Sequence, residues 1–340
     1  MTTHDLVTTA QAMLAVGKGI LAIDETVPTI TKRFEALGIV ATAKSRRDYR
    51  ELLIGTPGLA DFISGVILQD ETIRQRSADG TPFPELLQRQ GMMPGIKVDT
   101  GAKNLAAQTG EKITEGLDGL RERIVEYVGM GARFAKWRAV ITIGHNIPSR
   151  ACMVANAHAL ARYAALCQEG GLVPIVEPEV LMVGEHTIDR CYSVMEDTLH
   201  IVFHELAAQR VELESIVLKP SMVIAGEHAP RQAGVEEVAA ATLRCLRRTV
   251  PAAVPGVAFL SGGQSAELAT QHLNAMNYLG GVPWRLTFSY GRALQDPSLT
   301  AWRGDSAMVD TARQALYKRA RCNSAACTAG YSITMEAEVA

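Results

Sequence analysis

Short apolar segments recur along the whole chain, and glycine or other turn-forming residues separate them. The segments are rich in Val, Ile, Leu and Phe, and their length suits buried strands better than helices. The pattern predicts strands at Gly17–Asp24, Ile63–Gln69, Met93–Asp99, Ala132–Ile141, Leu172–Glu179, Ser215–Pro220, Gly256–Gly262 and Arg285–Tyr290.

Between most of these strands the apolar residues recur at helical spacing. The predicted apolar faces consist of Leu117, Leu120, Ile124 and Val128, of Val154, His158, Ala161 and Ala165, of Cys191, Met195, Thr198 and Val202, and of Val238, Leu243 and Leu246. A regular alternation of strands and helices is typical of a parallel sheet. Eight such units in 340 residues predict a (β/α)8 barrel. A doubly wound open sheet is the alternative, although no G-x-G-x-x-G motif follows the first strand.

The sequence contains no linker and no change of composition, so we predict one barrel domain over residues 1–320. A helix near Leu6–Val16 is expected before the first strand. After Ala320 the residues become small and polar, which predicts a flexible C-terminal tail over residues 321–340.

Composition excludes several classes of function. Lys and Arg total 34 against 36 Asp and Glu, and this balance lacks the basic surplus of a nucleic-acid-binding protein. The six cysteines lack the spacing of a disulfide framework and are expected to be reduced. The sequence shows no secretory signal and no apolar run of about 18 residues that would span a membrane. We therefore expect a soluble, cytoplasmic protein.

Charged residues end five of the predicted strands. They are Asp24, Lys97 and Asp99, Lys136 and Arg138, Glu177 and Glu179, and Lys219. Residues two apart on a strand point to the same side, so each pair is expected to face one way. A charge inside a barrel is costly unless it is paired or used, and barrel enzymes carry their catalytic groups at these strand ends. Surface charges that flank the strands are the alternative interpretation.

Lysines beside carboxylates in an apolar strand end indicate Schiff-base chemistry. Lys219 is the best candidate nucleophile because its flanking residues are apolar, and Lys136 would be the cation that lowers its pKa. Glu177 and Glu179 are candidates for proton transfer. The alternative for Lys219 is a strand-end lysine whose ammonium reaches solvent.

Two glycine-containing segments follow the last two strands, where barrels often bind phosphate. Glycines let backbone N–H groups approach an anion, and an arginine adds a planar cation. The candidates are Ser261, Gly262 and Gly263 in the first segment and Ser289, Gly291 and Arg292 in the second. Lys32 and Arg33 are candidates for a second phosphate, or else exposed helix residues. Together these segments predict a phosphorylated substrate.

We predict no metal and no cofactor. His200 and His204 are four residues apart, but they share a polar helix face with Ser193, Glu196 and Asp197. None of the eight histidines lies among the charged strand ends.

Specific motifs occur in every predicted strand. They are LAIDET at 21–26, GVIL at 65–68, PGIKVD at 94–99, FAKWR at 134–138, IVEPE at 175–179, VLKP at 217–220, FLSGGQS at 259–265 and LTFSYGRALQ at 286–295. In this order, from about residue 5 to residue 330, the sequence closely resembles the class I fructose-1,6-bisphosphate aldolases. FLSGGQS and TFSYGRALQ are the most specific of the motifs.

The resemblance implies a (β/α)8 enzyme that reversibly cleaves fructose 1,6-bisphosphate to dihydroxyacetone phosphate and glyceraldehyde 3-phosphate. By position, Lys219 would form the Schiff base, Glu177 would be the acid and base, and Lys136 would assist the carbinolamine steps. Asp24 would serve the C4 hydroxyl, and Glu179 would support the lysine pair. The resemblance also implies a homotetramer in glycolysis or gluconeogenesis.

The substrate-binding positions also follow from the resemblance. Lys97 and Arg138 would contact the sugar, and Lys32 and Arg33 would face its C6-phosphate. The expected C1-phosphate site consists of Ser261, Gly262, Ser289, Gly291 and Arg292.

Two departures from the family pattern bear on specificity. Thr26-Val27-Pro28-Thr29 replaces a Ser-Thr-Gly-Ser run beside the C6-phosphate, and the last tyrosine is Tyr331, whereas well-known members end in a tyrosine. A shifted specificity, for sedoheptulose 1,7-bisphosphate or fructose 1-phosphate, therefore remains an alternative. So does a non-catalytic scaffold; a pyridoxal-phosphate enzyme would also use a lysine imine.

Overall fold

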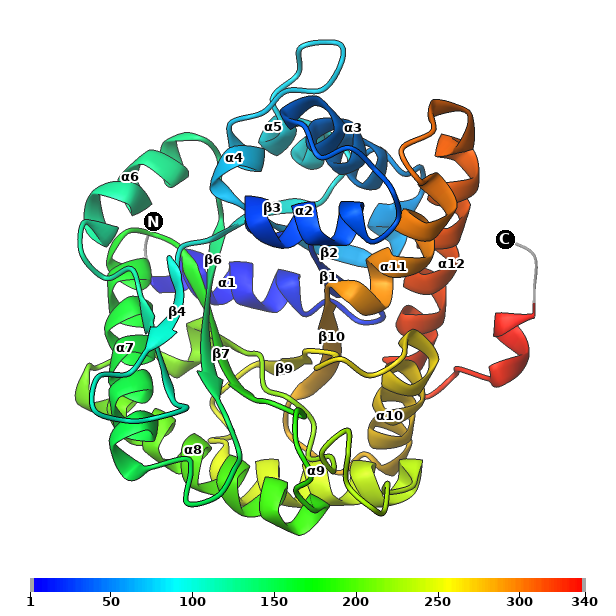
Figure 1. The fold of residues 1–340 in the computed structure, drawn as a ribbon. Coiled ribbons are helices and arrows are strands. Elements are labelled where there is room, and N and C mark those ends of the chain that lie inside the picture. The colour runs from blue at the N-terminus through cyan, green and yellow to red at the C-terminus, as the bar shows by residue number, and fades with distance from the viewer. Residues whose placement is uncertain (1–2, 338–340) are drawn as a thin grey trace.

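A computed structural model describes residues 3–337, and its central feature is a closed barrel of eight parallel strands (Figure 1). The strand order around the barrel is β1-β10-β9-β8-β7-β6-β3-β2. The strands are β1 Gly19–Ala22, β2 Ile63–Leu68, β3 Met93–Lys97, β6 Phe134–Ile141, β7 Val173–Val180, β8 Val217–Leu218, β9 Gly256–Phe259 and β10 Arg285–Tyr290. The predicted (β/α)8 barrel is confirmed, and closure excludes the open sheet.

Helices surround the barrel and separate most of its strands (Figure 1). They are α1 Thr3–Met13, α2 Val27–Glu35, α3 Ala43–Ile54, α4 Asp70–Ile73, α5 Phe83–Arg89, α6 Leu120–Gly129, α7 Arg150–Glu169, α8 Ile188–Ala208, α9 Val235–Thr249, α10 Ala266–Leu279, α11 Arg292–Trp302 and α12 Val309–Ala326. Short 3-10 helices lie at η1 Leu59–Asp61, η2 Leu213–Ser215, η3 Ser306–Met308 and η4 Ile333–Glu336. No helix within residues 3–337 is long and apolar enough to cross a membrane.

Hydroxyl side chains begin several of these helices. Thr42, Ser149, Thr187 and Ser265 each accept a hydrogen bond from a backbone N–H in the first turn of α3, α7, α8 and α10. Such caps satisfy N–H groups that have no partner inside the helix. They fix where the chain turns from each preceding loop into the helix.

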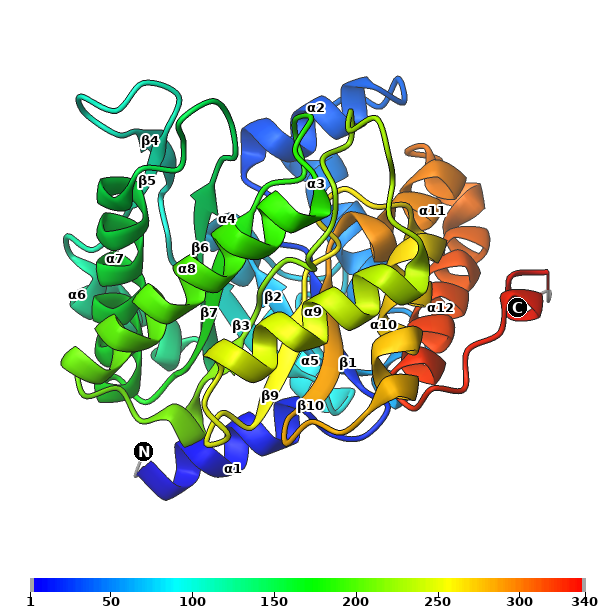
Figure 2. The same cartoon turned by 90° about the horizontal axis from the view of Figure 1, so that it is seen from below.

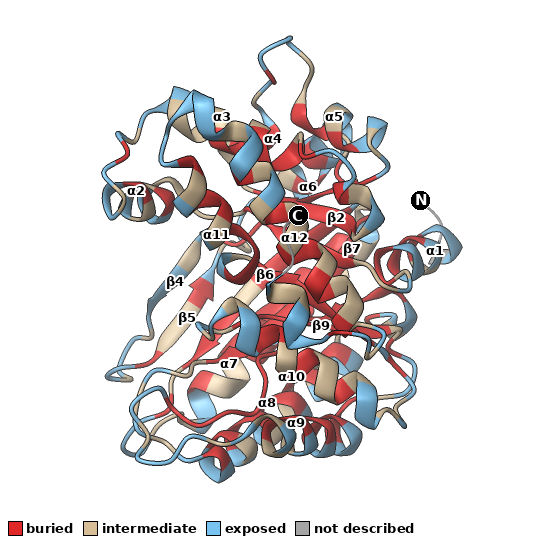
Figure 3. Cartoon of the chain, turned by 90° about the vertical axis from the view of Figure 1, so that its right-hand side faces the viewer, coloured by how far each residue is buried: buried red, intermediate tan, exposed pale blue. Residues whose placement is uncertain are grey.

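The interior of the barrel is apolar at one end and charged at the other. Helix α1 lies across the end opposite α2 and opposite the hairpin of β4 Gly101–Asn104 and β5 Lys112–Glu115 (Figure 2). Its Leu6, Ala10 and Met13 belong to one buried cluster with Phe134 and Val217 of the barrel strands. A second buried cluster joins the outer side of the barrel to the helices, and Figure 3 shows buried residues along the strands. Apolar packing thus closes one end and leaves the other for the strand-end charges.

Several predicted boundaries and faces are wrong. Only Val217–Leu218 pairs regularly in the sixth barrel strand, because Pro220 lacks an N–H. Helix α1 ends at Met13, before the turn at Gly17, where φ is 72°. Val128, expected on the buried face of α6, is exposed.

The predicted apolar face of α7 is also wrong. His158 is exposed, and its Nδ1 lies within hydrogen-bond distance of Oε2 of Glu205, at 2.9 Å, while Val154 is only half-buried. The buried side carries Asn156 and Tyr163 among others. Alanines lie on several sides of this helix, so the apolar pattern does not determine which side faces the barrel.

A two-stranded antiparallel sheet was not predicted. It joins β4 Gly101–Asn104 to β5 Lys112–Glu115 and follows β3. Of these residues Thr114 alone is buried, so the segments lack the alternating apolar pattern that identifies a half-buried strand.

The C-terminal tail was predicted to begin too early. Residues 321–326 are the last turns of α12, in which Cys322 and Asn323 are buried. Thr270 of α10 donates a hydrogen bond of 2.6 Å to Asn323, and this buried contact joins α12 to α10. Glu336 forms an ion pair with Arg319 of α12. The flexibility of the remaining tail stays a prediction.

We expect Gly95→Ala to destabilise the barrel by about 1–3 kcal/mol through overpacking. A Cβ at Gly95 would lie 2.1 Å from Cε2 of Phe134, whose ring fills the apolar end. Gly129→Ala is the matched control, because a Cβ there meets no atom within 4 Å. Urea unfolding followed by circular dichroism measures both variants. A Gly95→Ala protein as stable as the control would contradict this packing.

Candidate active site

A cavity of about 710 Å³ opens at the carboxyl ends of the barrel strands. Its lining includes every candidate site residue except Gly263. The candidates that line it are Asp24, Lys32, Arg33, Lys97, Lys136, Arg138, Glu177, Glu179, Lys219, Ser261, Gly262, Ser289, Gly291 and Arg292. The structure therefore brings residues from the whole length of the sequence into one cavity.

Two lysines and two carboxylates form the centre of this cavity. Nζ of Lys136 lies 2.7 Å from Oδ2 of Asp24 and 3.2 Å from Oε2 of Glu177. Nζ of Lys219 lies 3.3 Å from Oε1 of Glu177. The two lysines and Glu177 are buried, and Asp24 is half-buried. Glu177 thus contacts both lysines, whereas Lys136 contacts both carboxylates.

The backbone explains why these groups meet. Lys136 and Glu177 lie in the neighbouring strands β6 and β7, and each follows an apolar inward residue two positions earlier, Phe134 and Ile175. Lys219 follows β8, and its N–H donates to the carbonyl of Val176 at 2.8 Å. Strand alternation therefore directs these three side chains into the barrel.

The electrostatic setting distinguishes the two lysines. Burial lowers the pKa of Lys219, Lys136 lowers it further, and Glu177 opposes these effects. Burial also disfavours the charged form of Lys136, but Asp24 and Glu177 outweigh it and raise the pKa of Lys136. At neutral pH Lys136 therefore remains charged, whereas Lys219 is the lysine from which a proton is more easily removed.

Both carboxylates at the centre remain ionised at neutral pH. Burial alone would raise the pKa of Asp24, but Lys136 and Lys219 outweigh burial and lower it to about 2. The same two lysines lower the pKa of Glu177 against the effect of its burial. The carboxylates are thus able to accept protons during a reaction.

Two further ion pairs lie nearer the rim. Arg138 donates from Nε to Oε2 of Glu179, and Nζ of Lys97 lies 2.6 Å from Oδ1 of Asp99. Glu179 was expected to support the lysine pair, but its ion pair in the described structure is with Arg138. Glu177 contacts both lysines instead, because Glu179 lies two residues further along β7, towards the rim.

The two glycine-containing segments meet at one corner of the cavity. Gly262 and Gly263 have φ of 61° and 96°, a left-handed turn that glycine adopts without strain. Although Gly263 does not line the cavity, a Cβ there would lie 3.5 Å from Nη2 of Arg292. Oγ of Ser289 is buried and has no hydrogen-bond partner among the described residues. Backbone and hydroxyl donors beside a guanidinium suit a phosphate.

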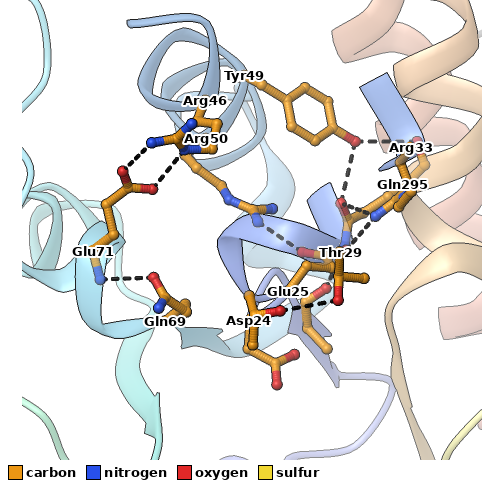
Figure 4. Close-up of polar contacts among 12 residues, drawn as sticks. Asp24, Glu25, Thr29, Arg33, Arg46, Tyr49, Arg50, Gln69, Glu71 and Gln295 are labelled. Carbon is orange, nitrogen blue, oxygen red and sulfur yellow. Dashed lines mark hydrogen bonds and ion pairs between the residues drawn. The ribbon is translucent and has the colours of Figure 1, made fainter. Parts of the chain in front are cut away.

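The other candidate cations lie in α2. Lys32 is exposed, whereas Arg33 forms an ion pair with Glu25 (Figure 4). Arg33 forms a second ion pair with Asp296 at 2.7 Å. Nη2 of the buried Arg50 lies 2.8 Å from Oε2 of Glu25, so this carboxylate joins two arginines. Burial opposes the ionisation of Glu25, but Arg50 and Arg33 outweigh it and lower its pKa.

Sequence reasoning did not select Glu25 or Arg50. Glu25 follows Asp24 in the LAIDET motif, which was the one available signal, whereas Arg50 lies in α3 without a motif. The segment Thr26-Val27-Pro28-Thr29, which departs from the family pattern, also contributes to the cavity lining. Oγ1 of Thr26 and Oγ1 of Thr29 lie there 3.0 Å apart.

Tyr331 lies outside this cavity. It lines a separate cavity with residues of α9 and α10, and its hydroxyl donates to Oε1 of Glu336 at 2.8 Å. His200 and His204 are exposed on α8. Within residues 3–337 no group of three or more His, Cys, Asp or Glu side chains is placed to hold a metal ion.

Comparison with known proteins identifies the family. The family model described as fructose-bisphosphate aldolase class-I matches residues 5–340. The chain belongs to this family. The resemblance that rests on the strand-end motifs is thereby confirmed.

The relatives of this aldolase cover nearly its whole length. It is 58% identical over 324 residues to a probable fructose-bisphosphate aldolase class 1 of Xanthomonas campestris. The match covers 95% of this chain and 97% of the relative. It is 50% identical over 330 residues to fructose-bisphosphate aldolase 4, cytosolic, of Arabidopsis thaliana, with 97% and 84% covered.

A solved structure shows the same fold. The fructose-bisphosphate aldolase of Plasmodium falciparum, determined in complex with TRAP and a small-molecule inhibitor, superposes with a TM-score of 0.96 at 48% identity. The match covers 97% of this chain and 95% of that chain.

Two substitutions in this aldolase are expected to move the pKa of Lys219 in opposite directions. Lys136→Met removes a neighbouring cation and raises it, whereas Glu177→Gln removes the carboxylate that favours the ammonium and lowers it further. The pH dependence of Lys219 acetylation by acetic anhydride, followed by peptide mass spectrometry, measures the change. The exposed Lys44 in the same digest is the internal control. Shifts in the same direction for both variants would contradict this electrostatic arrangement.

Proposed function

We propose that this class I aldolase cleaves fructose 1,6-bisphosphate reversibly to dihydroxyacetone phosphate and glyceraldehyde 3-phosphate through a Schiff base on Lys219. The observation that supports the assignment is the contact of Glu177 with Lys219 at 3.3 Å and with the charged Lys136 at 3.2 Å. These contacts bring a lysine of lowered pKa, a neighbouring cation and a shared carboxylate together in one buried cluster.

The first steps use the asymmetry of the two lysines. The neutral amine of Lys219 attacks the C2 carbonyl, and the C2 oxygen leaves as water once it is protonated. Glu177, which contacts both lysines, is placed to move these protons. Lys136 keeps its charge and stabilises the oxygen as negative charge develops on it.

Bond cleavage follows from the iminium on Lys219. Asp24 takes the proton of the C4 hydroxyl, the C3–C4 bond breaks, and its electrons move into the iminium to give an enamine. Glyceraldehyde 3-phosphate leaves first. Protonation at C3 and hydrolysis of the imine then release dihydroxyacetone phosphate and restore the lysine.

Phosphate recognition sets the direction in which the sugar lies. The corner formed by Ser261, Gly262, Ser289, Gly291 and Arg292 would bind the C1-phosphate. Lys32 and Arg33 would face the C6-phosphate, and Lys97 and Arg138 would contact the sugar between them. With the phosphates bound in this way, C2 would lie between the two ends of the cavity, beside the lysine centre.

The wider assignments rest on the family. A cytoplasmic location is supported by the word cytosolic in the name of the Arabidopsis relative. A homotetramer, a place in glycolysis or gluconeogenesis, and independence of metal and cofactor accord with the class I resemblance. We propose them on that ground.

Borohydride in the presence of dihydroxyacetone phosphate should trap a covalent adduct on Lys219, because it reduces the imine to a stable amine. Lys219→Met should abolish the adduct, and the surface variant Lys44→Met should keep it. Mass spectrometry of the peptide that contains residue 219 measures the result. An undiminished adduct in Lys219→Met would refute the assignment.

Substitutions at the two phosphate ends should separate the two phosphates of the substrate. Lys32→Gln should lower kcat/KM for fructose 1,6-bisphosphate by about 10-fold and leave fructose 1-phosphate nearly unchanged, because an ion pair with phosphate contributes about 1.5 kcal/mol. Arg292→Gln should lower both by similar factors. Steady-state assays with the two substrates measure the ratios. Equal losses on both substrates in Lys32→Gln would contradict the proposed orientation.

A further inference from the structure

A buried histidine supports the turn after β9 from the side of α10. His272 of α10 is 2% exposed, and its Nδ1 lies 2.5 Å from Oε1 of Gln264. The amide Nε2 of Gln264 donates to the carbonyl of Ser261 at 2.9 Å, and the backbone N–H of Gln264 donates to the same oxygen at 3.0 Å. His272, Gln264 and Ser261 thus form a continuous chain of hydrogen bonds that ends at the cavity.

The chemistry of these groups fixes the direction of every bond in the chain. The carbonyl oxygen of Ser261 can only accept, so the amide of Gln264 must turn its nitrogen towards Ser261 and its oxygen towards His272. That oxygen also only accepts, so Nδ1 of His272 must carry a proton. Burial lowers the pKa of His272 to about 4, so the ring is neutral at neutral pH and its Nε2 carries none.

The carbonyl that receives both donors determines where the next N–H points. The carbonyl of Ser261 and the N–H of Gly262 belong to one planar trans peptide, in which they point in opposite directions. Because two donors hold the Ser261 oxygen towards Gln264, the N–H of Gly262 is directed away from Gln264. Ser261 and Gly262 both line the cavity.

We propose that His272 is a positioning residue for substrate binding: through Gln264 it fixes the Ser261–Gly262 peptide so that its N–H is ready to bind the phosphate carried on C1. The inference rests on the proposed function, which assigns that phosphate to this turn. His272 itself touches no substrate. Its effect falls on the affinity for the phosphorylated ketose rather than on the lysine chemistry.

His272→Leu removes the donor but keeps an apolar side chain of similar size. The amide oxygen of Gln264 then loses its donor, so the amide is held from one side only and fixes the Ser261 carbonyl less firmly. We expect the half-saturating concentration of dihydroxyacetone phosphate in borohydride trapping to rise on the order of 10-fold, which is the range for a lost buried hydrogen bond. The adduct formed at saturation should stay unchanged.

Rescue and control variants separate positioning from general stability. His272→Asn places an amide nitrogen near the position of Nδ1 and should restore the half-saturating concentration to within about 3-fold of the original. Thr270→Val removes a buried hydroxyl of the same helix that bonds to Asn323, and it should not change ligand binding. Thermal unfolding records the stability of each variant.

A variant in the turn itself tests the inference without a core substitution. Gln264→Glu presents carboxylate oxygens to the Ser261 carbonyl, so it should also raise the half-saturating concentration. Unchanged binding in His272→Leu or Gln264→Glu, no rescue by asparagine, or an equal loss in Thr270→Val would overturn the inference. Absence of any adduct in the unaltered enzyme would instead contradict the proposed function.

Discussion

The carboxylate of Glu177 between two buried ammonium groups is the interaction on which the site depends. Lys136 contacts both this carboxylate and that of Asp24, whereas Lys219 contacts the carboxylate of Glu177 but not that of Asp24. With both lysines protonated the four charges sum to zero, which reduces the large cost of burying unpaired ions. Because Lys136 has the second carboxylate, removing its proton costs more than removing that of Lys219. The unequal sharing of two carboxylates thus decides which lysine loses its proton more easily.

This charged centre depends on the apolar end of the barrel. Phe134 is packed beside the glycines of β2 and β3, and Lys136 lies two residues further along the same strand. Two residues along one strand therefore separate the tightly packed apolar interior from the cluster of charged side chains. The rigid packing below leaves the ions little freedom to rearrange, and α1 covers the apolar end, so solvent reaches them from the cavity side.

The sequence was sufficient for the features that repeat locally. Alternation along strands predicted the inward direction of Lys136, Glu177 and Lys219, and the number of strand-helix units predicted the barrel. Which charged side chains form ion pairs with one another was not predictable, because it depends on which strands become neighbours and on the register between them. Glu177 and Glu179 both lie near the end of β7, and Arg138 of β6 lies opposite Glu177 in the register, yet Arg138 pairs with Glu179 and Glu177 contacts the two lysines.

The two ends of the cavity that we propose for phosphate differ in what a ligand would have to displace. The corner at Gly262 offers backbone donors in a preformed turn, so binding there requires little rearrangement. Arg33 at the other end already forms ion pairs with Glu25 and Asp296, and a phosphate bound there as proposed would compete with both. Arg50 remains with Glu25 if Arg33 turns away, so the carboxylate is never left without a cation. Under the proposed assignment Arg50 would therefore lower the cost of freeing Arg33 for a second phosphate, whereas the end at Gly262 would need no such exchange.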